Sequence, residues 1–327
     1  MNPELDRLGQ LTAKLKENIG LCARPEGSAG KDHEPSVDAV HDVRTGTRRI
    51  EAVLEAIQRS VQGNLARNPS DMKSAGEVLE EAIAGWQRLL KKIRRAAGAV
   101  RDLDVHRGLL GDLLKKTARQ EGPAEFEVSG DEAAHSPTPL QKQAEDLDAW
   151  LRHIRHEHSQ PIVAGATKWA NKLDRHLATL NEALQSQPAR RGRTTSPAAT
   201  ALDAFARLSH EMQQLYADNL HEFRKGAKKA RYMAETASND EHAGAVGKAL
   251  KRLQDEIGDW HDWLVLAEEA HRALGDHGVE LIAHIEKKRD QHYALALKIA
   301  ERMRGRLMGE WRASMAKPST SGHVNGR

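Results

Sequence analysis

Two blocks of this sequence occur twice, and in the same order. HDVRTGTRRIEAVLE, which begins at residue 41, matches HEFRKGAKKARYMAE, which begins at residue 221. LKKIRRAAGAVRDLDV, from residue 90, matches LKRLQDEIGDWHDWLV, from residue 250. Two matching blocks in one order indicate that the chain is built from two similar halves. Because the blocks are farther apart in the first copy, we expect a longer connection in the first half.

Apolar residues recur at helical spacing along nearly the whole chain, as Ile285, Leu295 and Ile299 do near its end. No stretch alternates in the manner of a strand, so the pattern predicts an all-α fold. Two similar helical halves predict two helical bundles related by a pseudo-two-fold axis. Ser36, which stands just before the periodic segment that starts near Val37, is expected to cap the beginning of a helix.

Residues that break helices cluster in three places. They lie at residues 22–36, 119–139 and 186–199. The last cluster is the best candidate for a linker, because Pro, Gly, Ser, Thr and Arg replace the helical pattern there. The sequence therefore predicts an N-terminal bundle over residues 1–185, with loop insertions near 22–36 and 119–139. A linker over 186–199 leads to a C-terminal bundle over 200–318 and a disordered tail over 319–327.

The charge balance excludes a molecule that is a polycation as a whole. Among 327 residues, Lys and Arg contribute 50 and Asp and Glu contribute 47, so the net charge is only +3. Any anion site must therefore come from local sorting of charge. With 39% apolar and 30% charged residues, the chain can bury a core, which excludes wholesale disorder. Because Cys22 is the single cysteine and no apolar run approaches ~20 residues, we expect a cytoplasmic protein without a membrane partner.

The first repeated block places basic residues along one side of a predicted helix. At about 100° per residue, His41, Arg44, Thr45 and Arg48 share one side, and the apolar residues Val43, Ile50, Leu54 and Ile57 fall on the other. The second copy repeats this geometry with His221, Arg224, Lys225, Lys228 and Tyr232. Residues 221–233 hold five Lys or Arg and one acid, Glu222. Like charges at helical spacing repel one another, and an anionic ligand would compensate them.

The second repeated block carries cations unequally in its two copies. Lys91, Arg94 and Arg95 share one helix face in the first copy. The second copy has Gln254 and Asp255 at the positions of Arg94 and Arg95, and it keeps only Lys251 and Arg252 as cations. If the two halves form a shared site, the first half supplies more of its charge.

These residue types suit a phosphate polymer. Arg grips phosphate oxygens in pairs, Lys supplies a mobile point charge, and His gains charge near pH ~6.5. Aromatic residues are few, and Trp86, Trp169 and Trp260 sit on apolar stripes, so stacking of RNA bases is poorly supported. A single basic row is usually a solvated helix face. Its recurrence at matching places in both halves favours a functional anion surface.

Four segments resemble the signature segments of the conserved histidine α-helical domain family, CHAD. They are VHDVRTGTRRIEAVLEAI, LKKIRRAAGAVRDLDV, LHEFRKGAKKARYM and LKRLQDEIGDWHD. The resemblance covers residues from about 5 to 312. It implies two four-helix bundles about a pseudo-two-fold axis, with a basic central channel that binds inorganic polyphosphate, and association with polyphosphate granules. The channel residues would be His41, Arg44, Arg48, Arg49, Lys91, Arg95, His221, Arg224, Lys228, Lys229, Lys251 and Arg252, and Arg94 and Lys225 join them as candidates on the same basic faces.

The second half departs from the first, since His261 stands where the first half has Arg101. The Glu-x-Glu-x-Lys signature of a triphosphate tunnel domain, which often precedes such domains, is absent from the sequence. The resemblance therefore gives no reason to expect triphosphatase activity.

Two other functions stay open. The dipeptides His41-Asp42 and His261-Asp262, with further histidines at 153, 156 and 158, could belong to a metal-dependent phosphohydrolase of the His-Asp type. Neighbouring residues on a helix point about 100° apart, however, and Glu222 follows His221 in the other copy. A general nucleic-acid or scaffold binder could use the same basic rows. We predict a binding protein that is not an enzyme and needs no cofactor, catalytic residue or metal ligand, and the sequence leaves its oligomeric state open.

Overall fold

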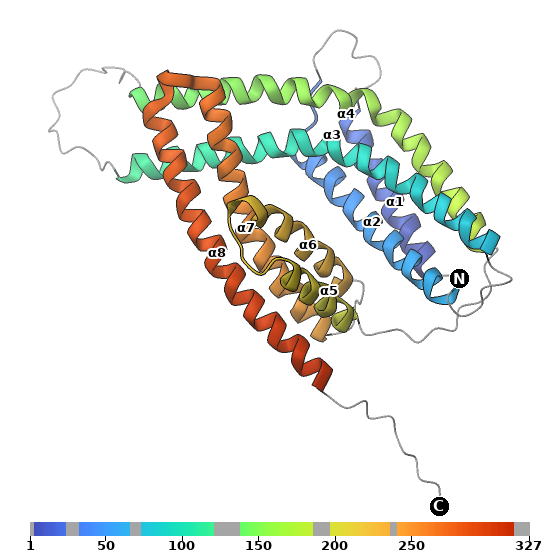
Figure 1. Cartoon of the computed structure of the whole chain (residues 1–327). Coiled ribbons are helices and arrows are strands. Elements are labelled where there is room, and N and C mark those ends of the chain that lie inside the picture. The colour runs from blue at the N-terminus through green and yellow to red at the C-terminus, as the bar shows by residue number, and fades with distance from the viewer. Residues whose placement is uncertain are drawn as a thin grey trace, which may run out of the picture. The chain divides into compact units, whose positions relative to one another are not determined.

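The computed structural model describes residues 3–23, 33–65, 73–120, 138–185, 197–235 and 241–316. These residues form eight α-helices and one 3-10 helix and contain no strand, which confirms the all-α prediction (Figure 1). The helices are α1 (Pro3–Cys22), α2 (Val37–Leu65), α3 (Lys73–Gln120), α4 (Pro139–Gln185), α5 (Pro197–Glu211), α6 (Ala217–Glu235), α7 (Glu241–Leu274), η1 (Gly275–Gly278) and α8 (Val279–Ala316). The expected tail and most of the three segments with helix breakers lie outside the described residues.

The chain divides into two compact units. The first comprises Met1–Gly192 and Asp262–Glu286, and the second comprises Arg193–His261 and Lys287–Arg327. The sequence assigned all of 200–318 to the second half, whereas the end of α7 and the start of α8 group with the first unit. The physical reason is an apolar cluster in which Trp263, Leu266 and Ile285 pack with Leu110 and Leu147. The domain limits and the pseudo-two-fold axis stay predictions.

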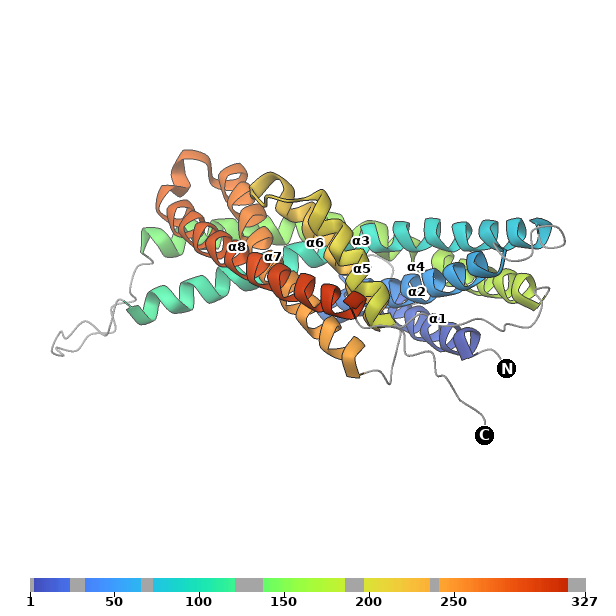
Figure 2. The ribbon, with the colours of Figure 1, turned by 60° about the horizontal axis from the view of Figure 1, so that its bottom comes forward.

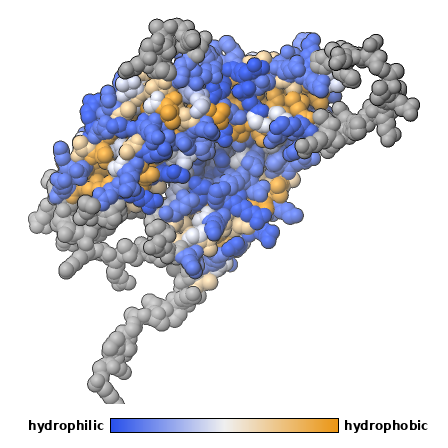
Figure 3. Space-filling model, turned by 180° about the vertical axis from the view of Figure 1, so that it is seen from behind, coloured by the Kyte–Doolittle hydropathy of each residue, from blue (hydrophilic) through white to orange (hydrophobic). Residues whose placement is uncertain are grey.

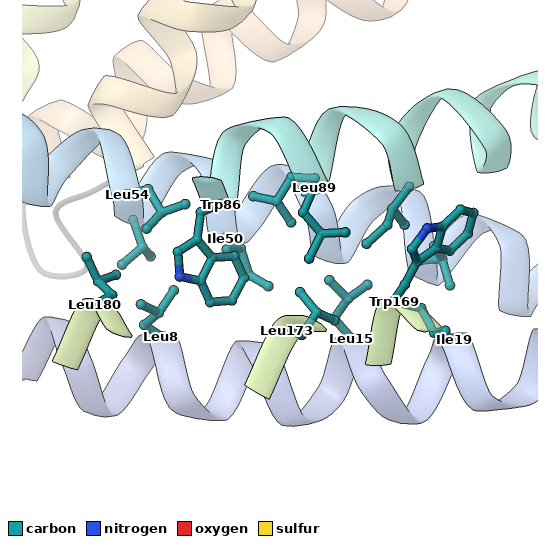
Figure 4. Packing of buried hydrophobic residues seen from close by; sticks show 14 of the residues in the cluster. Leu8, Leu15, Ile19, Ile50, Leu54, Trp86, Leu89, Trp169, Leu173 and Leu180 are labelled. Atoms are coloured by element: carbon teal, nitrogen blue, oxygen red, sulfur yellow. The ribbon is translucent and has the colours of Figure 1, made fainter. Parts of the chain in front are cut away.

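Helices α1 to α4 of the first unit share one hydrophobic core. Figure 4 shows side chains from all four helices meeting there, with Leu15 from α1, Ile50 from α2, Trp86 from α3 and Leu173 from α4. Each of these four side chains is fully buried. Burial of a large apolar side chain stabilises the folded state by roughly 1.5–3 kcal/mol. Figures 1 and 2 both show α3 and α4 side by side along much of their length. The first unit is therefore a four-helix bundle.

Glycines at matching positions of the repeat have the same role in each unit. A Cβ atom on Gly46 of α2 would lie 3.2 Å from the side chain of Leu15 in α1. A Cβ atom on Gly226 of α6 would lie 2.5 Å from the side chain of Leu208 in α5. Glycine therefore lets the preceding helix pack closely against the helix that carries the basic row, once in each unit.

Helices of the second unit pack through aromatic side chains. Phe205 of α5 and Phe223 of α6 stand edge to face, with ring centroids 5.8 Å apart. Trp260 of α7 meets Tyr293 of α8 at 5.5 Å. Arg304 of α8 lies 5.0 Å from the Phe223 ring centroid. The two contacts of Phe223 hold α6 against α5 and α8 by the face opposite His221, Arg224 and Lys228.

Hydrophilic side chains cover most of the face that Figure 3 presents. Apolar positions of the helical pattern are mainly buried, but Leu295 of α8 is 42% exposed. Among the described helices, none combines the length and the apolar composition needed to cross a membrane.

Candidate functional site

The first basic row stands on the outer side of α2. Ser36 caps the helix, because the backbone N–H of Ala39 donates to Ser36 Oγ at 3.2 Å. Val43, Thr47 and Ile50 are buried in the first core. His41 is consequently exposed, and Arg44 and Arg48 are half-buried. We call His41, Arg44 and Arg48 the α2 row, and the structure brings these three predicted residues together on one helix face.

Two predicted cations of the first unit already contact carboxylates. Arg44 Nη1 donates to Asp102 Oδ1 at 2.7 Å, which links α2 to α3. Arg94 of α3 forms a second ion pair with Glu51 of α2. An anion that approached Arg94 would have to compete with Glu51. Arg94 therefore joins the two helices.

Three other predicted cations lie outside the α2 row. Arg49 lines a hollow of about 60 Å³ with Lys14 of α1 and Asp42 of α2. Lys91 and Arg95 are exposed on α3, and Arg95 lines a separate groove between α3 and α4. Arg49, Lys91 and Arg95 form no ion pair with any residue that the structure describes. The first unit thus offers uncompensated positive charge on both sides of its α2 row.

The second unit repeats the arrangement on α6. Phe223, Ala227 and Ala230 are buried, which leaves His221, Arg224 and Lys228 half-buried on the other side. We call these three cationic positions the α6 row. Arg224 Nε donates to the backbone oxygen of Gln254 in α7 at 3.1 Å. A Cβ atom on Gly258 would lie 2.6 Å from Arg224 Nη2, so glycine at that position gives the guanidinium room to cross α7.

His221 occupies an unusual environment within the α6 row. Its ring lies against the ring of His261 in α7, with centroids 4.3 Å apart. Its Nδ1 atom is buried and has no hydrogen-bond partner among the described residues. Burial, and then the charges of Lys225 and Arg224, lower the pKa of His221 below its usual value. The imidazole is therefore largely neutral at neutral pH, and a nearby anion would favour its protonation.

Two of the four remaining predicted cations of the second unit pair with acids. Lys225 Nζ donates to Glu222 at 2.7 Å, and this hydrogen bond lowers the pKa of the Glu222 carboxyl. Lys251 Nζ donates to Asp255 at 2.5 Å. Lys229 and Arg252 form no ion pair with the part of the chain that the structure describes. Predicted cations that form no ion pair with a described residue thus occur in both units.

The family comparison agrees with the four repeated segments. The CHAD domain model matches residues 21–271. The chain belongs to the CHAD domain family. CHAD domains are associated with polyphosphate binding. The comparison with curated proteins and the comparison with solved structures found no match.

Histidines outside the two rows of this CHAD chain have separate partners. His153 contacts Glu157 at 3.4 Å, and His156 contacts Glu34 at 2.9 Å. His158 lines the groove between α3 and α4. The described residues contain no group of three or more His, Cys, Asp or Glu side chains arranged to hold a metal ion.

Sequence reasoning missed several charged residues that contact the predicted cations or lie near them. The acidic partners Glu51 and Asp102 were not recognised, because they lie on a different helix from the arginine that each contacts. Asp255 could have been recognised as a partner, since it stands four residues after Lys251 on one helix. Lys168 gave no signal, because it belongs to neither repeated block.

Proposed function

We propose that this CHAD protein binds inorganic polyphosphate through the α2 row and the α6 row and does not cleave the polymer. The observation that carries the proposal is the recurrence of one row, His-x-x-Arg-x-x-x-Arg or Lys, on the outer side of a helix in each unit. Each row has at least one guanidinium group, a chemistry that can grip phosphate oxygens, together with a titratable imidazole. Family membership supplies the ligand class.

Polyphosphate fits these rows better than a nucleic acid does. It needs cations along its length but no surface on which bases stack. Trp86, Trp169, Trp260 and Trp263 are at most 5% exposed and belong to the hydrophobic interior. These four of the six indoles are thus used for packing, which favours a ligand recognised by charge.

The proposal extends to one strand and to one place in the cell. We propose that a single polyphosphate strand contacts both rows, as in the basic central channel expected from the sequence. We further propose that the protein is cytoplasmic and associates with polyphosphate granules. Binding of one strand by two rows would raise affinity through effective concentration, beyond what either row provides.

The direct test is a calorimetric titration of the full chain with long-chain polyphosphate at about 50 mM and 200 mM salt, with RNA as competitor. We expect saturable binding that weakens steeply with salt and resists RNA of matched charge. The polymer recovered after incubation with Mg²⁺ or Mn²⁺ should keep its length. Equal competition by RNA would support a general nucleic-acid binder, and shortening that a chelator abolishes would support a phosphohydrolase.

Replacing Asp255 by Arg is expected to strengthen polyphosphate binding. Asp255 stands where the first half has Arg95, and its carboxylate neutralises Lys251. Asp255→Arg adds a cation and releases Lys251, so affinity should rise on the order of tenfold at low salt. The control is Asp203→Arg on α5, which makes the same charge change and releases Arg207 from an ion pair of the same spacing. An equal gain from both substitutions would mean that the ligand responds only to net charge.

Polyphosphate binding should become tighter on acidification, because of His221. Its pKa is lowered in the free protein by burial, Lys225 and Arg224, followed by Lys228, with Glu222 opposing. Phosphate oxygens beside the ring raise this pKa, so the complex holds more protons than the free protein between the two values. Affinity therefore increases as the pH falls from the pKa of His221 in the complex to its pKa in the free protein, which lies below about 6.5. At still lower pH, His221 is protonated in both states and its contribution to affinity is constant.

Titrations at a series of pH values, with wild type and His221→Gln side by side, measure this effect. The difference between the two curves of affinity against pH gives the contribution of His221. It excludes the contributions of His261 and of the ends of the polymer, which are common to both proteins. Parallel curves would show that His221 takes up no proton on binding.

A further inference from the structure

A groove of about 550 Å³ lies between α3 and α4, within the first unit. Its volume falls in the range of about 300–1,000 Å³ that is typical of small-molecule sites. It is bordered by α3 residues such as Arg95 and by α4 residues such as Lys168. We call it the α3/α4 groove, and neither row of the proposed polyphosphate surface forms it.

The walls of the groove are made of small side chains. Ala96 and Ala99 come from α3, and Pro161, Ala164 and Gly165 come from α4. Beneath them Trp169, which is only 4% exposed, is packed in the core. Small residues on two facing helices leave a slot in which a flat group can lie close to both backbones. The walls are thus suited to a flat aromatic ring.

The rim of the groove is cationic. Lys92, Arg95 and Lys168 line it together with His158, and no acidic residue does so. Lys92, Arg95 and Lys168 form no ion pair with any described residue. Three cations around one hollow repel one another, and a bound anion would offset that repulsion. Charge complementarity therefore requires a ligand with several negative charges.

We propose that the α3/α4 groove binds a nucleoside polyphosphate, with its ring between the small residues and its phosphates on Lys92, Arg95 and Lys168. Inorganic polyphosphate has no apolar part and makes no use of the Ala, Gly and Pro walls. This site is therefore separate in chemistry from the polyphosphate surface and does not depend on it. Arg95, which the sequence assigned to that surface, lies on the border of this one.

The test is calorimetric titration of the full chain with ATP, tripolyphosphate and adenosine, each alone. ATP should bind at least tenfold more tightly than either of the other two, because only ATP has both the ring and the charges. Ala164→Leu, which fills the groove without changing charge, should weaken ATP binding about tenfold and leave the affinity for long-chain polyphosphate unchanged. Lys168→Gln should also weaken ATP binding.

Two control variants lie on the exposed face of the same helix. Ala178→Leu and Lys142→Gln repeat the chemical changes at positions that do not line the groove, and ATP affinity should not change in them. Thermal unfolding of all four variants checks that the bundle is intact. Equal affinity for ATP and tripolyphosphate, or equal loss of ATP binding in Ala164→Leu and Ala178→Leu, would overturn the proposal.

Discussion

Arg48→Glu combined with Lys228→Glu is expected to weaken binding of long-chain polyphosphate by about 100-fold or more at low salt. The two residues hold the same place in the repeat, four residues after Arg44 and Arg224, and both are half-buried on the outer side of their helix. A hydrogen bond to a charged group contributes about 1.5–3 kcal/mol, so loss of one in each row alone accounts for this factor. Charge reversal adds repulsion. The measurement is a titration against salt, in which the slope should fall by about 0.7–0.9 per lost phosphate contact.

The matched control for this double variant is Lys142→Glu combined with Lys298→Glu. Each unit again loses one cation, and both lysines are exposed and form no ion pair with the described residues. A similar loss of binding in both double variants would mean that polyphosphate follows overall charge and not the rows. The single variants Arg48→Glu and Lys228→Glu test whether one strand contacts both rows. If it does, each single substitution lowers the affinity of the whole chain for polyphosphate. Two independent sites would instead give two separate affinities.

The sequence predicts the fold well because the helical pattern directly records which side chains are buried. Ile50 and Leu54 were placed on an apolar stripe, and both are fully buried. Ser36 was expected to begin a helix at Val37, and α2 begins there. The sequence placed Asp262–Glu286 in the second half, whereas these residues group with the first unit, because a helix that leaves one unit can pack in another without any change in its own pattern.

The candidate site is less predictable, because helical spacing shows which cations share a face but not what they contact. Helical spacing placed Arg44 and Arg94 on basic faces, yet each contacts an acid on a neighbouring helix. Such pairs depend on how helices are juxtaposed, which no single helix encodes. The α3/α4 groove is hidden for a similar reason, because Ala96 and Ala164 look like ordinary helix formers until α3 and α4 face each other.

A buried ion network holds the segment that leads into the α2 row. Arg155 of α4 is 4% exposed, and its Nε donates to Asp104 Oδ1 at 2.6 Å. Its Nη1 donates to Glu34 at 2.8 Å and its Nη2 to the backbone oxygen of Pro35 at 2.9 Å. Burial by itself would lower the pKa of Arg155, but Asp104 and Glu34 outweigh it and raise that pKa above its usual value. Because Ser36 follows at once as the helix cap, the network fixes where α2 begins.

Arg155→Leu is therefore expected to destabilise the protein by about 3–5 kcal/mol, the largest stability change that we predict. The substitution leaves the Asp104 carboxylate, whose side chain is 1% exposed, buried without its main partner. Urea unfolding monitored by circular dichroism measures the change as a lower midpoint. Since Glu34 and Pro35 lose their anchor too, the start of α2 should also exchange its amide hydrogens faster.

Two further variants separate the buried charge from general damage to α4. Arg152→Leu removes an arginine less than one turn earlier, whose pair with Asp148 is 2.9 Å long and whose side chain is 60% exposed. An exposed pair of this kind is worth about 0–1 kcal/mol, so the midpoint should hardly move. Replacing both Arg155 and Asp104 by Leu also removes the Asp104 carboxylate that Arg155→Leu leaves without its partner. The double variant should therefore regain a large part of the lost stability. If the double variant were no more stable than Arg155→Leu, the cost would lie in lost packing and not in an uncompensated carboxylate.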